Sequence, residues 1–136
     1  MIITRQMAIK GRDKKFAAEF TEEVNSNINK TIARASELLS RMGKDKVYVT
    51  SGWRPKSINS SVGGAPNSLH IYGLAIDISD PDKSIGQWCV QNIETLSEIG
   101  IWMESLIKTH ASDTPEERWI HWQVQPPKSG NRIFLP

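Results

Sequence analysis

The sequence has almost no cysteine, no long apolar run and no strong excess of charge of one sign. Cys89 is the only cysteine, so an internal disulfide is excluded, and its place in an apolar helical pattern predicts a buried core residue. No stretch approaches about 18 consecutive apolar residues, and the N-terminus lacks the apolar region and cleavage site of a secretory signal. We therefore expect synthesis in a cytoplasm and no stable insertion in a membrane.

The charges are also poorly suited to a nucleic-acid-binding protein. The 17 basic and 15 acidic residues give a net charge of +2 and are spread along the chain, with no basic stripe. Low-complexity tracts and internal repeats are absent as well. A length of 136 residues lies in the range of about 100 to 200 residues that is usual for one domain. We expect residues 1–136 to form a single domain and the protein to be a monomer that binds no nucleic acid.

Apolar residues at intervals of three to four predict two amphipathic helices. The first extends from Phe16 to Met42, and a break near Thr21 is one option. The second covers residues 85–99 and is expected to be capped near Asp82 or Ser84.

Short alternating segments predict four strands, at residues 47–50, 74–79, 101–105 and 119–124. Residues 53–68 read as a loop rich in Gly, Pro, Ser and Asn, and its length is unusual unless the loop is functional. Residues 108–118 read as a polar surface loop, in which His110 is expected to be exposed.

Two of these strands carry a potential metal ligand on the face opposite their apolar residues. These ligands are Asp77 and His121, and His70 could reach the same point if Gly73 allows a sharp change of direction. Two imidazoles and one carboxylate suit zinc, and three protein ligands leave a position open for water, as in catalytic sites. A hydrogen-bonded His–Asp pair or a strand-end cap is the alternative interpretation.

Zinc in such a site would polarise a scissile carbonyl and lower the pKa of its bound water toward about 7. Hydrolysis also needs a proton acceptor for that water and a cation or donor for the developing oxyanion. Arg54 and several glutamates are available for these tasks.

The residues from Ser51 to Asp77 resemble the zinc peptidases of the M15 family. That family has the signature S-x-H-x-x-G-x-A-x-D, which is matched here by Ser68, His70, Gly73, Ala75 and Asp77. A late W-x-H motif occurs at residues 119–121, and the following P-P-K-S-G-N-R is similar to the ending of small phage-type members. The resemblance implies an α+β fold of the hedgehog and DD-peptidase type, with a small, mainly antiparallel sheet and two main helices.

The resemblance also implies roles for individual residues. His70, Asp77 and His121 would be the zinc ligands, and Arg54 would bind the substrate carboxylate or stabilise the oxyanion. Ser68 and Asn67 would line the site, and Trp53 and Trp119 are candidates for a cleft wall.

The general base is the point at which the sequence departs from the family pattern. Several branches have a catalytic acid three residues before the last zinc histidine, but that position is Arg118, which cannot accept a proton. Glu104 is our first candidate for the base, because the strand carrying it resembles the strand that precedes the W-x-H strand in phage-type members. Glu117 and Glu116 are further candidates, with solvated surface acids as their alternative interpretation.

The function implied is that of a zinc metallopeptidase acting on peptidoglycan stem peptides, either a D-alanyl-D-alanine carboxypeptidase or an L-alanyl-D-glutamate endopeptidase. Without a signal peptide, it would reach the cell wall after membrane permeabilisation or from a virion, as a phage or prophage endolysin or lysis protein. The alternative is a catalytically weak, zinc-containing module that binds the cell wall or serves as a virion structural component.

Overall fold

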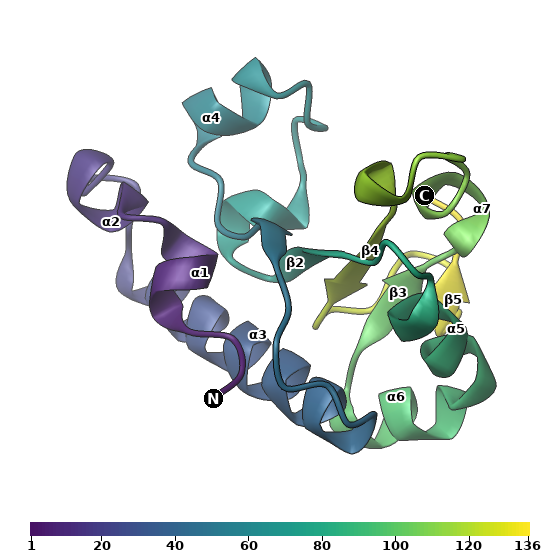
Figure 1. Cartoon of the computed structure of the whole chain (residues 1–136). Coiled ribbons are helices and arrows are strands. Elements are labelled where there is room, and N and C mark those ends of the chain that lie inside the picture. Colours follow the sequence, from purple (N-terminus) through teal and green to yellow (C-terminus); the bar gives the residue numbers. More distant parts are fainter.

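The computed structural model describes residues 1–136 and contains a five-stranded sheet with the order β1-β2-β4-β3-β5 (Figure 1). The strands are β1 (Val49–Ser51), β2 (Ala75–Ser79), β3 (Trp102–Glu104), β4 (Trp119–Gln123) and β5 (Ile133–Phe134). Three of the four strand pairs are antiparallel, and β3 with β5 is parallel. The predicted α+β class with a mainly antiparallel sheet is therefore confirmed.

The longest helix, α3 (Glu22–Arg41), begins later than the predicted start at Phe16. Its N-cap is Thr21, whose hydroxyl accepts the backbone N–H of Val24 at 3.1 Å. Phe16 instead ends the short helix α2 (Arg12–Lys15), which follows α1 (Arg5–Ile9). The apolar period continued through Thr21, but the cap fixes a change of chain direction there.

The second predicted helix is divided into α5 (Ser84–Gln91) and α6 (Ile93–Ile99). Asn92 separates them with the non-helical angles φ −131° and ψ 47°, and its side-chain amide donates to the Trp88 carbonyl at 2.8 Å. Because the apolar residues lie on both sides of Asn92, their spacing alone did not reveal this break.

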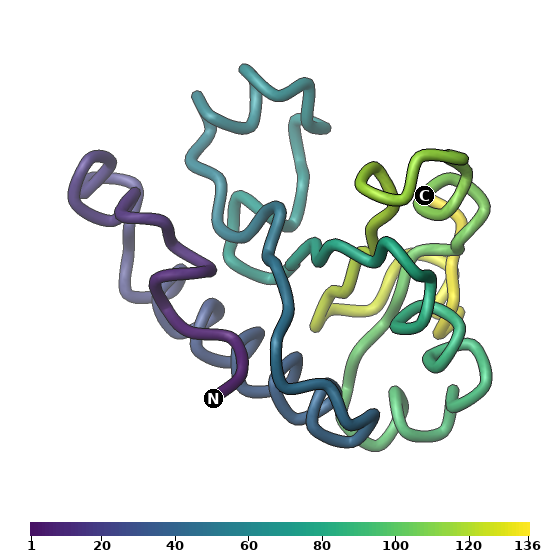
Figure 2. Tube along the Cα trace, in the orientation of Figure 1, coloured from purple at the N-terminus to yellow at the C-terminus, as the bar shows by residue number.

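Both predicted long loops contain short helices. Residues 53–68 include α4 (Lys56–Ser61), and the tube in Figure 2 shows this segment projecting from the rest of the molecule. The Asn59 side chain donates to the Ala65 carbonyl at 2.8 Å and so holds the segment together. The later loop includes part of α7 (Leu106–Thr109) and all of η2 (Pro115–Glu117).

One face of the sheet contributes to the core. Its buried side chains pack in one cluster with the apolar stripe of α3; the strand members are Val49, Ile76, Ile78, Met103, Ile120 and Trp122. The opposite face is left for polar side chains, because residues alternate between the two faces of a strand. No helix has the combination of length and apolar character that crossing a membrane requires.

Candidate metal centre

Three neighbouring strands place one ionisable side chain each at the same level of the sheet. Asp77 on β2 is opposite His121 on β4 in the antiparallel register. Met103 on β3 is opposite Trp122 on β4, so one more step along this register brings Glu104 opposite His121. These three side chains share the face that points away from the core. The pairing of the strands therefore aligns a carboxylate, an imidazole and a second carboxylate in a row.

His70 reaches this row from the 3₁₀ helix η1 (Leu69–Tyr72). The Ser68 hydroxyl caps η1 by accepting the His70 backbone N–H at 3.2 Å. Gly73 ends η1 with φ +76°, and a Cβ atom there would lie 2.7 Å from Ile28 Cγ1. Both the backbone angle and the lack of space require glycine. The change of direction at Gly73 that the sequence analysis required is thus present, and it turns the chain from η1 into β2.

The three predicted metal ligands converge on one oxygen atom. Asp77 Oδ1 lies 3.2 Å from His70 Nε2 and 2.8 Å from His121 Nδ1, and one ligand atom from each residue lies within 4.8 Å of the others. The His70 side chain is 3% exposed, whereas those of Asp77 and His121 are 13% and 14% exposed. Asp77 and His121 are therefore the more accessible of the three side chains. Three larger grooves, one of about 410 Å³ and two of about 330 Å³, are lined by other residues.

The outer nitrogen of each imidazole faces an acceptor. His70 Nδ1 lies 2.9 Å from the Gly52 carbonyl oxygen, and His121 Nε2 lies 2.9 Å from Gln123 Oε1. With protons on these outer nitrogens, the two inner nitrogens would direct lone pairs toward Asp77 Oδ1. Three acceptor atoms at these distances would then be stabilised by a cation among them. Two imidazoles and one carboxylate are a donor set that suits zinc, so the residues fit the metal.

The close approach of these groups shifts the pKa values of Asp77 and His121. Burial by itself would raise the pKa of Asp77, but the charges of and hydrogen bonds from His70 and His121 lower it well below its usual range. Burial would lower the pKa of His121, but Asp77, Gln123 and Glu104 together raise it. In the metal-free protein, a proton on His121 therefore compensates for the converging acceptors.

Glu104 and Arg54 border this group. Burial, with a smaller contribution from Asp77, raises the pKa of Glu104, so this carboxyl accepts a proton more readily than an exposed glutamate. Burial lowers the pKa of Arg54, while the charge of Asp77 opposes that shift. The Arg54 Nη2 atom donates to Ser68 Oγ at 3.4 Å, and its buried Nε atom has no partner. Arg54 thus retains donor capacity beside the metal ligands.

The remaining predicted site residues lie farther out. Asn67 is exposed, and Trp119 is half-buried at the start of β4, on the same face as His121. Trp53 is 1% exposed and its indole N–H donates to the Ile71 carbonyl at 2.9 Å, so its proposed place in a cleft wall is wrong. Trp53 can be buried in the core because the Ile71 carbonyl accepts its only side-chain N–H group.

The alternative candidates for the base are separate from the three ligands. Glu116 and Glu117 are exposed on η2 and form no hydrogen bond or ion pair with the ligands. Arg118 donates to the carbonyl oxygens of Pro81, Ser112 and Asp113. The guanidinium at the usual acid position therefore fixes the surrounding loops.

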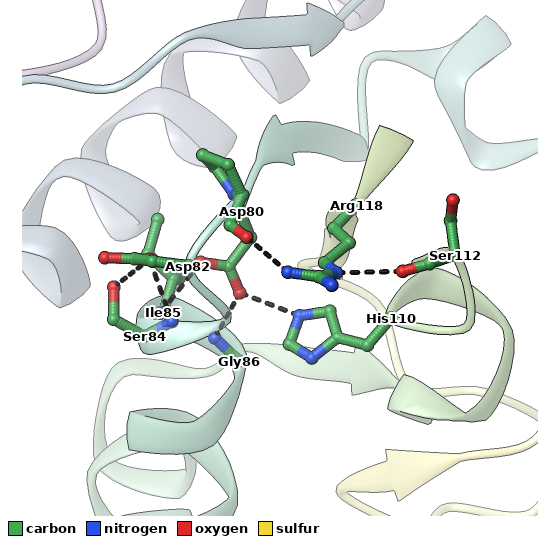
Figure 3. Close-up of polar contacts among 9 residues, drawn as sticks. Asp80, Asp82, Ser84, Ile85, Gly86, His110, Ser112 and Arg118 are labelled. Atoms are coloured by element: carbon green, nitrogen blue, oxygen red, sulfur yellow. Dashed lines mark hydrogen bonds and ion pairs between the residues drawn. The ribbon is translucent and has the colours of Figure 1, made fainter. Parts of the chain in front are cut away.

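The structure contains a second His–Asp pair that the sequence analysis missed (Figure 3). Asp80, directly after β2, is completely buried and its Oδ2 atom lies 2.8 Å from His110 Nε2. The same carboxylate accepts the backbone N–H groups of Ile85 and Gly86 at the start of α5. The expected exposure of His110 is wrong, since only 8% of its side chain is exposed. The signal available was an aspartate near a predicted helix start, but Asp82 and Ser84 gave the same signal.

Comparison with known proteins identifies one matching family. The family model described as Peptidase M15 matches residues 4–109 of the 136, well over half of the chain. The matched segment includes Arg54, His70, Asp77 and Glu104 and ends before His121. No curated protein matches the chain. His121 therefore enters the site through the observed pairing of β4 with β2, independently of the family match.

Proposed function

Because the chain belongs to the peptidase M15 family of zinc-dependent peptidases, we propose that it hydrolyses peptide bonds in the stem peptides of bacterial peptidoglycan. The proposed ligands are His70, Asp77 and His121. The bond is either one between D-alanines, cleaved by a carboxypeptidase, or one between L-alanine and D-glutamate, cleaved by an endopeptidase. We further propose that the protein acts as a phage or prophage endolysin or as a virion lysis protein.

One observation carries the proposal: Asp77, His121 and Glu104 lie side by side on three adjacent strands, with His70 directed at the same point. When bound there, zinc supplies Lewis-acid activation of the scissile carbonyl and of water. The proposed role of Glu104 is to accept the proton of the attacking water and pass it to the leaving amine. Its raised pKa suits this task, because a general base works best when its pKa is close to the working pH.

Arg54 is the proposed binding group for an anion. Its planar guanidinium can bind a substrate carboxylate or the developing oxyanion in a bidentate manner. The buried Nε atom has no partner within the protein, and an unpaired buried donor is costly, which supports a ligand as its missing partner. Ser68 would hold the other side of the guanidinium, while Asn67 and Trp119 would contact substrate farther from the metal.

The first experiment measures zinc content and peptidoglycan cleavage on the same purified protein. We expect one zinc ion per chain and release of new amino termini from purified peptidoglycan, with the mass of the fragments identifying the bond. The His70→Ala variant should lose both zinc and cleavage. The control variant Glu116→Gln, at an exposed residue, should keep both. A chain that binds no stoichiometric zinc, or undiminished cleavage by His70→Ala, would refute the proposal.

A second candidate function is a zinc-containing module that binds the cell wall with little or no turnover. Arg118 favours it, because this residue occupies the usual acid position and is held by three backbone carbonyls. The same samples separate the two functions. Zinc and wall binding without fragment release would favour the second function, whereas fragment release that depends on Glu104 would favour the peptidase.

A further inference from the structure

Gln123 is a buried polar residue at the end of β4, two residues beyond His121 and on the same face of the strand. It is 6% exposed, and both ends of its side-chain amide have partners. The Nε2 atom donates to the backbone carbonyl of Gln125 at 2.8 Å, and the Oε1 atom lies 2.9 Å from His121 Nε2. The side chain therefore links a fixed backbone group to the outer nitrogen of a proposed metal ligand.

The orientation of the Gln123 amide follows from its contact with the backbone. A flipped amide would place Oε1 against the Gln125 carbonyl oxygen, and two acceptors at 2.8 Å repel each other. The amide nitrogen must therefore face Gln125, which leaves the oxygen to face His121. That oxygen can only accept, so it provides a partner for a proton on His121 Nε2, whereas Asp77 Oδ1 provides the competing partner for a proton on Nδ1.

We propose that Gln123 is a positioning residue for the metal centre, because its fixed acceptor oxygen stabilises the His121 ring with the proton on Nε2, the form whose Nδ1 can bind a metal ion. The inference rests on the proposed function in taking zinc as that metal. It assigns no contact with substrate to Gln123.

The competing state of the site shows why such a residue is needed. With its proton on Nδ1, His121 would donate a hydrogen bond to Asp77 Oδ1 across the observed 2.8 Å. That bond would occupy one ligand nitrogen and one ligand oxygen together. An acceptor beyond Nε2 stabilises the other tautomer and so lowers the free-energy cost of moving the proton off Nδ1 when a metal ion binds there.

The two histidines differ in the group that accepts a proton on the outer ring nitrogen. The outer nitrogen of His70 faces the backbone carbonyl of Gly52 at 2.9 Å, which no side-chain substitution removes. His121 depends on the side chain of Gln123 instead. The tautomer of His121 can therefore be changed by one substitution, and that makes the proposal testable.

The first test compares the zinc affinity of three variants by competition with a chromophoric chelator. Gln123→Met keeps the side-chain volume but removes the acceptor, and we expect about 10- to 100-fold weaker zinc binding, as for other partners of metal-bound histidines. Gln123→Glu keeps an acceptor and should bind zinc as tightly as the wild type or more tightly. Gln125→Ala retains the backbone carbonyl and should not differ from the wild type.

The second test reads the tautomer directly from the ring ¹⁵N shifts of His121 in the metal-free protein, at a pH alkaline enough for a neutral ring. We expect a larger population of the Nε2–H tautomer in the wild type than in Gln123→Met. Wild-type zinc affinity in a folded Gln123→Met variant, or equal Nε2–H populations in the wild type and this variant, would overturn the proposal. If Gln123→Met did not fold, weaker zinc binding by Gln123→Glu would overturn it. A wild-type protein that binds no zinc would refute the proposed function, whereas the tautomer measurement would still decide the role of Gln123.

Discussion

Two His–Asp pairs lie close together around the end of β2, and they behave differently. His121 with Asp77 and His110 with Asp80 each have a nitrogen–oxygen distance of 2.8 Å. Asp77 lies within the strand, and Asp80 follows its last residue by one position. By residue type, distance and position along the chain, the two pairs are almost indistinguishable.

They differ in how many donors each carboxylate receives. Asp80 accepts two backbone N–H groups at the start of α5 as well as the contact with His110, and it is completely buried (Figure 3). Asp77 accepts no backbone N–H group in this structure and instead faces two imidazole nitrogens, each belonging to a ring whose other nitrogen has its own acceptor. The proposed metal site is therefore distinguished by two histidines directed at one carboxylate oxygen, and not by the proximity of one histidine to an aspartate.

The largest effect should come from removing the Asp77 carboxylate, which both His70 and His121 face. Asp77→Ala should lose zinc and reduce peptide cleavage by about 10³-fold or more, because a catalytic metal contributes several kcal/mol to transition-state stabilisation. Zinc stoichiometry by atomic absorption and fragment release by chromatography measure the two losses. The matched Asp80→Asn variant should keep its zinc, and an Asp77→Ala protein that retains zinc would contradict the comparison.

The next largest effect concerns the carboxylate beside the metal ligands. Glu104→Gln should lower kcat by about 10²- to 10⁴-fold, because it removes the proposed proton acceptor. Zinc binding should be unchanged, since Glu104 is not a proposed ligand. Glu117→Gln, on the exposed helix η2, is the control, and a large loss of kcat in this variant instead would identify Glu117 as the base.

The Asp80–His110 pair should contribute to the stability of the fold and not to peptide cleavage. Asp80→Ala should reduce the free energy of unfolding by about 3 to 5 kcal/mol, because it leaves His110 and two backbone N–H groups without their buried partner. Urea denaturation at neutral pH gives this value. The folded fraction should still bind zinc with wild-type stoichiometry, and loss of zinc with unchanged stability would reverse the roles of the two pairs.

These differences also mark what the sequence could and could not predict. The α+β class was implied by the resemblance to the M15 family, and residue alternation placed Asp77 and His121 on the strand faces opposite their apolar residues. Glu104 could be suggested only from the likeness of its strand. Its position opposite His121 depends on a pairing between β3 and β4 that local patterns do not specify.

The roles of His110 and Gln123 were beyond reach for a different reason. His110 contacts Asp80 across a sequence separation of 30 positions, which carries no signal. Gln123 shares a strand face with His121, but that spacing does not show that its side chain is buried and bound to the Gln125 carbonyl. A polar segment with one histidine is most often an exposed loop, and a glutamine at a strand end is most often solvated. Only the folded structure shows that His110 contacts the Asp80 carboxylate and that Gln123 contacts His121 and the Gln125 carbonyl.

A smaller effect is expected at Gly86, which allows His110 to approach Asp80. A Cβ atom at this position would lie 2.6 Å from His110 Cε1 and 2.8 Å from Leu106 Cδ2. Gly86→Ala should therefore destabilise the protein by about 1 to 3 kcal/mol through overpacking. Thermal unfolding measures the loss, and an unchanged midpoint would show that His110 and Leu106 can move away from the added atom.

The smallest effect should be seen in the pH dependence of the metal-free protein. The pKa of Asp77 is lower in the folded than in the unfolded chain, so its contribution to stability is present above about pH 4 and is lost as the pH falls. The pKa of His121 is raised on folding, so its contribution is complete below about pH 6.5 and is lost as the pH rises through the folded pKa. The pair should therefore stabilise the metal-free protein most between these values.

Urea midpoints across this pH range, with a chelator present, test whether the pattern belongs to Asp77. Asp77→Asn should flatten both limbs, because the acidic limb requires its carboxylate and the alkaline limb requires the proton that this carboxylate holds on His121. Zinc should move the maximum to higher pH, since metal ligation requires a deprotonated ligand nitrogen. If Asp77→Asn kept the wild-type profile, the interaction of Asp77 with His121 would not be the source of this pH dependence.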